Sequence, residues 1–208
     1  MAGPDTKQRT LYYVHDPMCS WCWAFRPVWS RIRERAPEDL LLRRVLGGLA
    51  PDSDEPMSQE MQHYLQGVWR TIQQRVPGTR FDFSFWEHCQ PRRATYPACR
   101  AVIAARSQSP ASEEPMILAI QQAYYLQARN PSDNTVLTAL AVGIGLDAEQ
   151  FAQALDASET QLRLEEEMAF GRTIGVQGFP SLVLEQAGQY RLLNHDYNDA
   201  QVVLEQLV

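Results

Sequence analysis

The chain has 208 residues, of which 45% are hydrophobic and 21% are charged, and its formal net charge is −6. This composition is typical of a globular domain with a sizeable core, and it excludes a disordered or collagen-like chain. The acidic balance, without any block of basic residues, argues against nucleic acid as a partner.

No stretch of the sequence predicts a membrane span. The most apolar stretch, residues 137–146, has about half of the roughly 20 residues that cross a bilayer. The first ten residues also lack the charged and then apolar run of a secretory leader. We therefore expect a cytoplasmic protein without membrane contact, in which structural disulfides are rare and cysteines serve catalysis, metal binding or packing.

The chain begins as strand, helix and strand. Residues 11–14 are apolar and rich in strand-forming side chains, so they predict a buried strand. A helix is predicted from residue 19 to about residue 36, with a kink at Pro27, and a second strand covers residues 40–46. This order favours a right-handed crossover between parallel strands.

The middle of the chain is predicted to be helical, because its apolar residues recur at the spacing of one helix face. Ser132 and Asp147 are suited to cap two of these helices. The predicted helices span residues 57–76, 94–106, 115–129, 132–142, 148–155 and 159–172.

The strand pattern returns near the C-terminus. Strands are predicted at residues 181–185 and 189–193, with Ala187-Gly188 as a hairpin turn between them. A last helix is predicted over residues 200–207. We see no repeats and no linker long enough to separate independent domains.

The motif Cys19-Ser20-Trp21-Cys22 follows a predicted strand and opens a predicted helix. Two cysteines three positions apart on a first helical turn place two thiols within bonding reach, which thiol–disulfide exchange requires. The positive end of the helix dipole favours a thiolate, so we expect Cys19 to attack and the more buried Cys22 to resolve.

Structural packing and metal binding are the alternatives for these cysteines. Cys89 and Cys99 are too far apart in the sequence to form the second knuckle of a zinc site, so no metal is expected. Cys99 lies in an apolar helix, and for this pair we favour two packed thiols over a disulfide bond.

A second candidate motif, Gly178-Phe179-Pro180, comes directly before a predicted strand. Proline has no N–H for a sheet ladder and therefore belongs at the start or edge of a strand. Taken alone, the motif indicates a turn. A cis bond before Pro180 would present the Phe179 backbone beside an active site.

Taken together, the two motifs and the long helical insertion resemble the DsbA family of thioredoxin-fold oxidoreductases. The form Asp16-x-x-Cys19-x-Trp21-Cys22 is most similar to its FrnE-like cytoplasmic branch. The resemblance implies an α/β thioredoxin-like fold of residues 1–48 and 175–208. A helical subdomain of residues 49–174 would be inserted after the β-α-β unit.

The resemblance also implies roles for single residues. Cys19 matches the exposed nucleophile and Cys22 the resolving cysteine. Pro180 matches a cis-proline that faces the disulfide, and Phe179 matches the residue whose backbone pairs with an extended substrate. Ser20 stands where relatives often have Pro, and no His lies between the cysteines, so we expect a milder redox potential than that of the periplasmic members.

Two further residues near the cysteines have open roles. Asp16 either relays protons to Cys22 or only shapes the turn with Pro17. Trp21 is a candidate for substrate binding. Together with Trp23 and Phe25 it could form an apolar rim that holds unfolded chains, although core packing explains Trp23 and Phe25 equally well.

The expected function is thiol–disulfide exchange, as an oxidoreductase or disulfide isomerase acting on protein or peptide thiols and disulfides. No organic cofactor is expected, and an external thiol such as glutathione would exchange electrons with the pair. One alternative is a glutathione-dependent transferase or isomerase of the kappa-class or hydroxychromene-carboxylate type, which typically has Ser where Cys19 stands. The other is a redox-independent holdase. The sequence does not indicate the substrate or the direction of electron flow.

Overall fold

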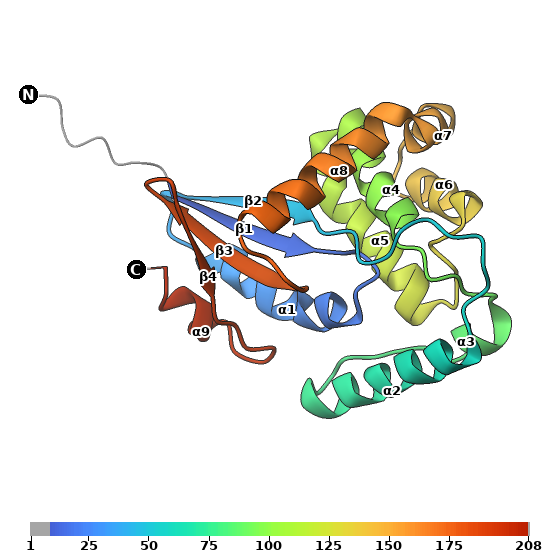
Figure 1. The fold of residues 1–208 in the computed structure, drawn as a ribbon, viewed down its shortest axis with the longest axis horizontal. Coiled ribbons are helices and arrows are strands. Elements are labelled where there is room, and N and C mark those ends of the chain that lie inside the picture. Colours follow the sequence, from blue (N-terminus) through green and yellow to red (C-terminus); the bar gives the residue numbers. More distant parts are fainter. Residues whose placement is uncertain (1–8, 208) are drawn as a thin grey trace, which may run out of the picture.

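Four strands of the computed structural model, which describes residues 9–207, form one mixed sheet (Figure 1). Across the sheet the order is β2 (Leu40–Leu46), β1 (Arg9–His15), β3 (Ser181–Gln186) and β4 (Gln189–Leu193). β1 runs parallel to β2 and antiparallel to β3. The parallel pairing predicted from the sequence is therefore confirmed. The first eight residues, where the sequence shows no leader pattern, lie outside the described residues.

Helices fill most of the remaining chain, and all predicted helices are present with ends shifted by no more than three residues. Their bounds are α1 Ser20–Arg35, α2 Gln59–Arg75, α3 Phe85–His88, α4 Tyr96–Gln108, α5 Glu113–Leu126, α6 Asn134–Gly143, α7 Ala148–Asp156, α8 Ser158–Thr173 and α9 Gln201–Leu204, with a short 3₁₀ turn at Pro110–Ser112. α1 continues through Pro27. Within residues 9–207, every helix is too short or too polar to span a bilayer.

One of the two predicted helix caps is wrong. The Asp147 carboxylate accepts a hydrogen bond from Gln150 N at 2.8 Å and caps α7, as predicted. Ser132 lies two residues before α6, and its hydroxyl donates instead to the Ala94 carbonyl at 2.7 Å. The buried Ala94 carbonyl needs a donor, and this long-range partner could not be found from local sequence.

The alternation of side chains along β1 gives the sheet two buried faces. Leu11 and Tyr13 pack with α1 and α9 on one face. Tyr12 and Val14 point to the other face, where Phe170 of α8 covers them. Burial of each such large apolar side chain contributes about 1.5–3 kcal/mol relative to its exposure. The two faces thus fix α1, which carries the cysteines, against the sheet.

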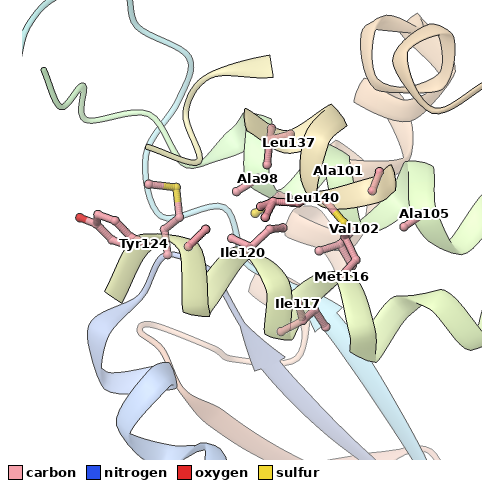
Figure 2. Close-up of a cluster of buried hydrophobic side chains, with 14 of the residues drawn as sticks. Ala98, Ala101, Val102, Ala105, Met116, Ile117, Ile120, Tyr124, Leu137 and Leu140 are labelled. Atoms are coloured by element: carbon pink, nitrogen blue, oxygen red, sulfur yellow. The ribbon is translucent and has the colours of Figure 1, made fainter. Parts of the chain in front are cut away.

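Helices α4 to α7 gather at one end of the sheet and share a core of their own (Figures 1 and 2). Alanines on one face of α4 let α5 and α6 approach closely, since they add little volume. The labelled members of this cluster in Figure 2 are Ala98, Ala101, Val102, Ala105, Met116, Ile117, Ile120, Tyr124, Leu137 and Leu140. α8 contacts both α4 and β2. The division into residues 49–174 and the flanking parts stays a prediction.

Candidate functional site

Cys19 and Cys22 lie together at the N-terminus of α1. Cys19 is the N-cap residue with an extended backbone, and Cys22 lies in the first turn. Both side chains are free thiols; Cys19 is 6% exposed and Cys22 has no exposed surface. The first N–H groups of a helix have no partner within the helix, so Cys19 lies at a site that favours negative charge.

The two thiols differ in their surroundings. Burial raises the pKa of the Cys22 thiol well above its ordinary value, and the neighbouring Cys19 raises it further. A raised pKa disfavours the thiolate, which is the nucleophilic form of a cysteine. The geometry therefore places Cys19 at the helix terminus and Cys22 behind it.

The Phe179-Pro180 turn lies against the first cysteine. The Phe179–Pro180 peptide bond is cis, and the Cys19 thiol donates to the Phe179 carbonyl oxygen at 3.6 Å across 160 residues of sequence. A Cβ atom at Gly47 would lie 2.1 Å from the Phe179 ring, so any other residue there would require that ring to move. The sequence motif and the cysteine pair thus form one site.

Asp16 is fully buried directly before the cysteines, and its carboxylate accepts four hydrogen bonds. One oxygen accepts from Met18 N at 2.7 Å. The other accepts from Leu49 N at 2.7 Å, from the Thr95 hydroxyl at 2.6 Å and from the Cys99 thiol at 3.5 Å. Burial raises the pKa of Asp16, while these donors lower it.

These contacts bear on the two roles predicted for Asp16. The bond to Met18 N closes the turn around Pro17, so the turn-shaping role is confirmed. Asp16 acts on the pKa of Cys22 in two opposite ways, because its backbone lowers that pKa and its charge raises it. The relay of protons stays a prediction. Thr95 and Cys99 are parts of the site that sequence reasoning missed, because nothing local links them to Asp16.

The helical part of the chain contributes a second contact to the cysteine motif. The indole N–H of Trp69, on α2, donates to the Ser20 hydroxyl at 2.9 Å. Trp69 has no exposed surface, and its ring stacks on Phe81 with the centroids 4.8 Å apart. A buried tryptophan usually finds a partner for its N–H, and this was the signal available in the sequence.

The other aromatic residues of the motif have different surroundings. Trp21 is half-buried and packs against Tyr197, with ring centroids 4.9 Å apart. Trp23 stacks on Tyr125 at 5.6 Å, and Phe25 is completely buried in the core under the sheet. The core alternative therefore holds for Phe25, and the apolar rim predicted from all three residues is wrong for it.

The remaining cysteines are not joined to each other. Cys89 donates to the Ala128 carbonyl at 3.0 Å, whereas Cys99 contacts Asp16, and both are free thiols as favoured from the sequence. Among residues 9–207, no group of three or more His, Cys, Asp or Glu side chains could hold a metal ion.

A cavity of about 220 Å³ opens beside the Cys19 sulfur. Its walls come from the start of α1, from the loops around residues 49–50 and 92–95, and from α2. Trp21 and Phe179, which the sequence predicts to bind substrate, both line it. Tyr64 of α2 and Arg93 also line it, and sequence reasoning missed both, because helix packing brings them there.

Comparisons with known proteins match nearly the whole chain. Residues 12–202 match the family model described as Thioredoxin. A solved structure of a candidate protein disulfide isomerase from Nitrosomonas europaea is similar with a TM-score of 0.82 and 29% identity, covering 97% of this chain and 96% of that one. The cytosolic disulfide reductase DsbM from Pseudomonas aeruginosa has a TM-score of 0.74 and 26% identity, with coverage of 95% and 93%. DsbM has also been solved with GSH.

The curated relatives carry a different description. The ClpXP adapter protein SpxH of Bacillus subtilis is 25% identical over 181 residues, which are 86% of this chain and 59% of that protein. The ClpXP adapter protein SpxH of Halalkalibacterium halodurans is 23% identical over 188 residues, with shares of 86% and 61%. The chain thus spans about three fifths of the length of these relatives.

Proposed function

This chain belongs to the thioredoxin family, and on that premise we propose that it is a DsbA-like oxidoreductase that exchanges thiols and disulfides through Cys19 and Cys22. One observation carries the proposal. Cys19 is the N-cap residue of α1 and its thiol donates to the Phe179 carbonyl, while Cys22 is buried one turn further on. A substrate sulfur that approaches Cys19 therefore meets a helix terminus and an open backbone carbonyl at once.

The proposed cycle uses only sulfur atoms. The Cys19 thiolate attacks a substrate disulfide, so that a mixed disulfide forms and one substrate thiolate leaves and takes a proton. Cys22 then loses its proton and attacks the Cys19 sulfur, which releases the second substrate thiol. The enzyme ends as a Cys19–Cys22 disulfide, two electrons have reduced the substrate, and the reverse sequence donates a disulfide.

The other site residues serve these two steps. The Phe179 backbone pairs with an extended substrate and Pro180 faces the disulfide, while Trp21 covers the substrate from the side of α1. The pKa of the Cys22 thiol is raised, so removal of its proton requires a nearby base, and Asp16 takes that role. An Asp16→Asn variant should therefore keep the first step and slow the second, as measured by the lifetime of the mixed disulfide.

The neighbours suggest the compartment and the electron partner. DsbM is named as cytosolic, and one of its structures was solved with GSH. We extend both properties to this chain, so that glutathione in the cytosol reduces the Cys19–Cys22 disulfide. No metal or organic cofactor takes part in such a cycle. Isomerisation, which the name of the Nitrosomonas europaea structure suggests, would use the first step and then the attack of another substrate thiolate on the mixed disulfide, which forms a new substrate disulfide and releases Cys19.

Equilibration in glutathione redox buffers tests the proposal. The protein is quenched with acid at several ratios of thiol to disulfide, alkylated and analysed by mass spectrometry. We expect one disulfide, between Cys19 and Cys22, whose fraction follows the ratio. A Cys89→Ser variant serves as the matched control and should behave as wild type. Absence of a Cys19–Cys22 bond at every ratio would contradict the proposal.

The curated relatives favour a second candidate, in which the chain binds a protein without reacting with it. They are named ClpXP adapter proteins, and they match 86% of this chain. A variant with Cys19→Ser and Cys22→Ser separates the two functions. If this variant still suppresses the aggregation of a denatured protein, a binding role is favoured. If the suppression is lost when both thiols are removed, thiol–disulfide exchange is favoured.

A further inference from the structure

The cavity beside Cys19 has one uncompensated positive charge at its rim. Arg92 and Arg93 both line the cavity, but Arg92 is paired with Asp133 at 2.6 Å. Within residues 9–207, no carboxylate oxygen lies within 4.0 Å of the Arg93 guanidinium, whose side-chain contact there is the Met61 sulfur at 3.5 Å. None of the described residues that line the cavity is acidic.

The same cavity is flanked by exposed apolar side chains. Leu49 is 42% exposed and Tyr64 is 64% exposed, and both line the cavity that opens at Cys19. Single exposed apolar residues are ordinary, but two of them beside one reactive sulfur and one free cation form a surface with defined chemistry. It suits a chain segment that carries an apolar side chain and a negative charge.

We propose that Arg93 selects extended peptide disulfides that carry a carboxylate beside the reacting cysteine. The inference rests on the proposed function and names the substrate class of the same site. Cys19 attacks the substrate sulfur as described above, and Arg93 takes no part in the transfer of electrons or protons. It pairs with the substrate carboxylate while an apolar neighbour of the substrate cysteine covers Leu49 and Tyr64.

Size and charge favour this occupant. A cavity of about 220 Å³ holds side chains of a segment and not a folded surface. The exposed Leu49 and Tyr64 extend the contact beyond what a single residue covers. The whole chain carries a net charge of −6 and repels acidic substrates at long range, so a preference for carboxylates must come from a local cation.

Matched peptide disulfides test the proposal with the full chain. The Cys22→Ser variant is reduced and mixed with symmetrical pentapeptide disulfides that differ only in having Asp, Asn or Lys after the cysteine. The rate of mixed-disulfide formation at Cys19 is followed by acid quenching and mass spectrometry. We expect the Asp peptide to react about two- to fivefold faster than the Asn peptide, as for one exposed ion pair, and the Lys peptide to be slowest. The preference should shrink as salt is added.

Arginine variants assign the preference. In the same background, Arg93→Gln should bring the ratio of the Asp to the Asn rate to about one, Arg93→Lys should keep it, and Arg93→Glu should favour the Lys peptide. Arg31→Gln is the matched control, because Arg31 is an exposed arginine of α1 that does not line the cavity. If the ratio of the Asp rate to the Asn rate is the same in Arg93→Gln as in Arg31→Gln, the proposal is overturned.

Two further probes separate its failure from that of the proposed function. If the uncharged hydroxyethyl disulfide reacts with Cys19 but the Asp and Asn peptides react equally, the selection by Arg93 is overturned and the exchange function stands. If no disulfide reacts with Cys19, both are overturned. Arg93→Gln could instead slow the reaction of Cys19 with glutathione disulfide relative to its neutral ester, while the rates with the peptide disulfides stay unchanged. In that case the site serves a free tripeptide, and the proposal of an extended peptide substrate is overturned.

Discussion

At the scale of single residues, the site separates two thiols that are close in sequence. Cys19 is the N-cap residue of α1 and lines the cavity, whereas Cys22 has no exposed surface and a raised pKa. Since only a thiolate attacks a disulfide, this difference sets the order of the two steps in the proposed cycle. It also implies that the steps can be interrupted one at a time.

Removal of the second thiol should trap the intermediate. In Cys22→Ser, Cys19 still attacks substrates, but nothing resolves the mixed disulfide. We expect covalent complexes in cell extract that reductant clears, seen as shifted bands on non-reducing gels. Cys19→Ser is the control and should give none. Equal numbers of adducts in the two variants would contradict the order of the steps.

A second residue near the site, His15, should make the stability of the fold depend on pH. His15 is buried at the end of β1 and stacks on Tyr13 with centroids 4.9 Å apart, and among residues 9–207 its Nε2 has no hydrogen-bond partner. Burial, with the charges of Arg44 and Arg106, lowers the pKa of His15 from 6.5 to about 3. Between these values the unfolded chain binds a proton that the folded chain does not, so stability falls as the pH falls.

This linkage gives a measurable slope. Between pH 7 and pH 5, His15 should cost about 2 kcal/mol of unfolding free energy, since one proton per pH unit is worth about 1.4 kcal/mol. His15→Leu should remove that part of the pH dependence in urea denaturation. His63→Gln, a change at an exposed histidine of α2, should leave the pH dependence as in wild type. An unchanged slope in His15→Leu would refute the argument.

At the scale of elements, the sequence predicts most of the fold because the signals are local. The period of apolar residues located α2 and α4 to α8, and the hairpin turn is confirmed by the positive φ of Ala187 and Gly188. α3 was missed, since its four residues are too short to show a period. The predicted last helix, residues 200–207, is shorter in the structure, where α9 ends at Leu204.

The parts of the site that could not be predicted are contacts between distant segments. The contact between Cys19 and Phe179 was expected only because the family resemblance places the motif of Phe179 beside the cysteines. The bonds of Asp16 to Thr95 and of Trp69 to Ser20 span 79 and 49 residues and have no pattern in the sequence. They depend on how the helical insertion packs on α1, which periodicity does not determine.

The contact between α1 and α2 should be measurable as a coupling energy. Trp69→Phe keeps an aromatic ring in the core but removes the indole N–H that Ser20 accepts. We expect a loss of about 1–3 kcal/mol from smaller volume and a lost hydrogen bond. In a double-mutant cycle with Ser20→Ala, the coupling should be about 0.5–1.5 kcal/mol. Additive effects in urea denaturation would show that this bond contributes nothing.

At the scale of the whole molecule, the helical part is fastened to the sheet by charges as well as by apolar packing. Glu114, in the first turn of α5, accepts hydrogen bonds from Arg26 at 2.7 Å and Arg33 at 3.0 Å, both on α1, and from Arg44 of β2. Glu113 pairs with Arg44 at 3.1 Å. Carboxylates in a first helical turn also interact favourably with the helix dipole.

The network continues to two further helices. Arg106 of α4 pairs with Glu113 at 3.0 Å and also with Glu167 of α8. Glu167 in turn accepts from the backbone N–H of Leu46 at the end of β2, at 2.7 Å. These groups are partly buried, with Arg44 at 14% and Glu113 at 17% side-chain exposure, so solvent screens them less than surface pairs.

Neutralising Glu114 should therefore weaken the contact of α5 with α1 and β2. Glu114→Gln leaves Arg26, Arg33 and Arg44 facing one another without a carboxylate between them, at a cost of about 1–3 kcal/mol. For a chain of this length, that corresponds to a fall in Tm of roughly 2–12 °C. The fall should shrink with added salt, because the arginines then repel one another less.

The control for this variant is an ion pair of the same chemistry on an open surface. Glu159 pairs with Arg163 one turn apart on α8, with side-chain exposures of 73% and 49%. Such pairs contribute about 0.3–0.5 kcal/mol, so Glu159→Gln should lower Tm by no more than about 2 °C. Thermal unfolding by circular dichroism at low and high salt compares the two variants. Equal and small shifts in Tm would mean that apolar packing alone joins the helices to the sheet. A large, salt-sensitive shift in Tm confined to Glu114→Gln would show that the partly buried charges hold α5 against α1 and β2.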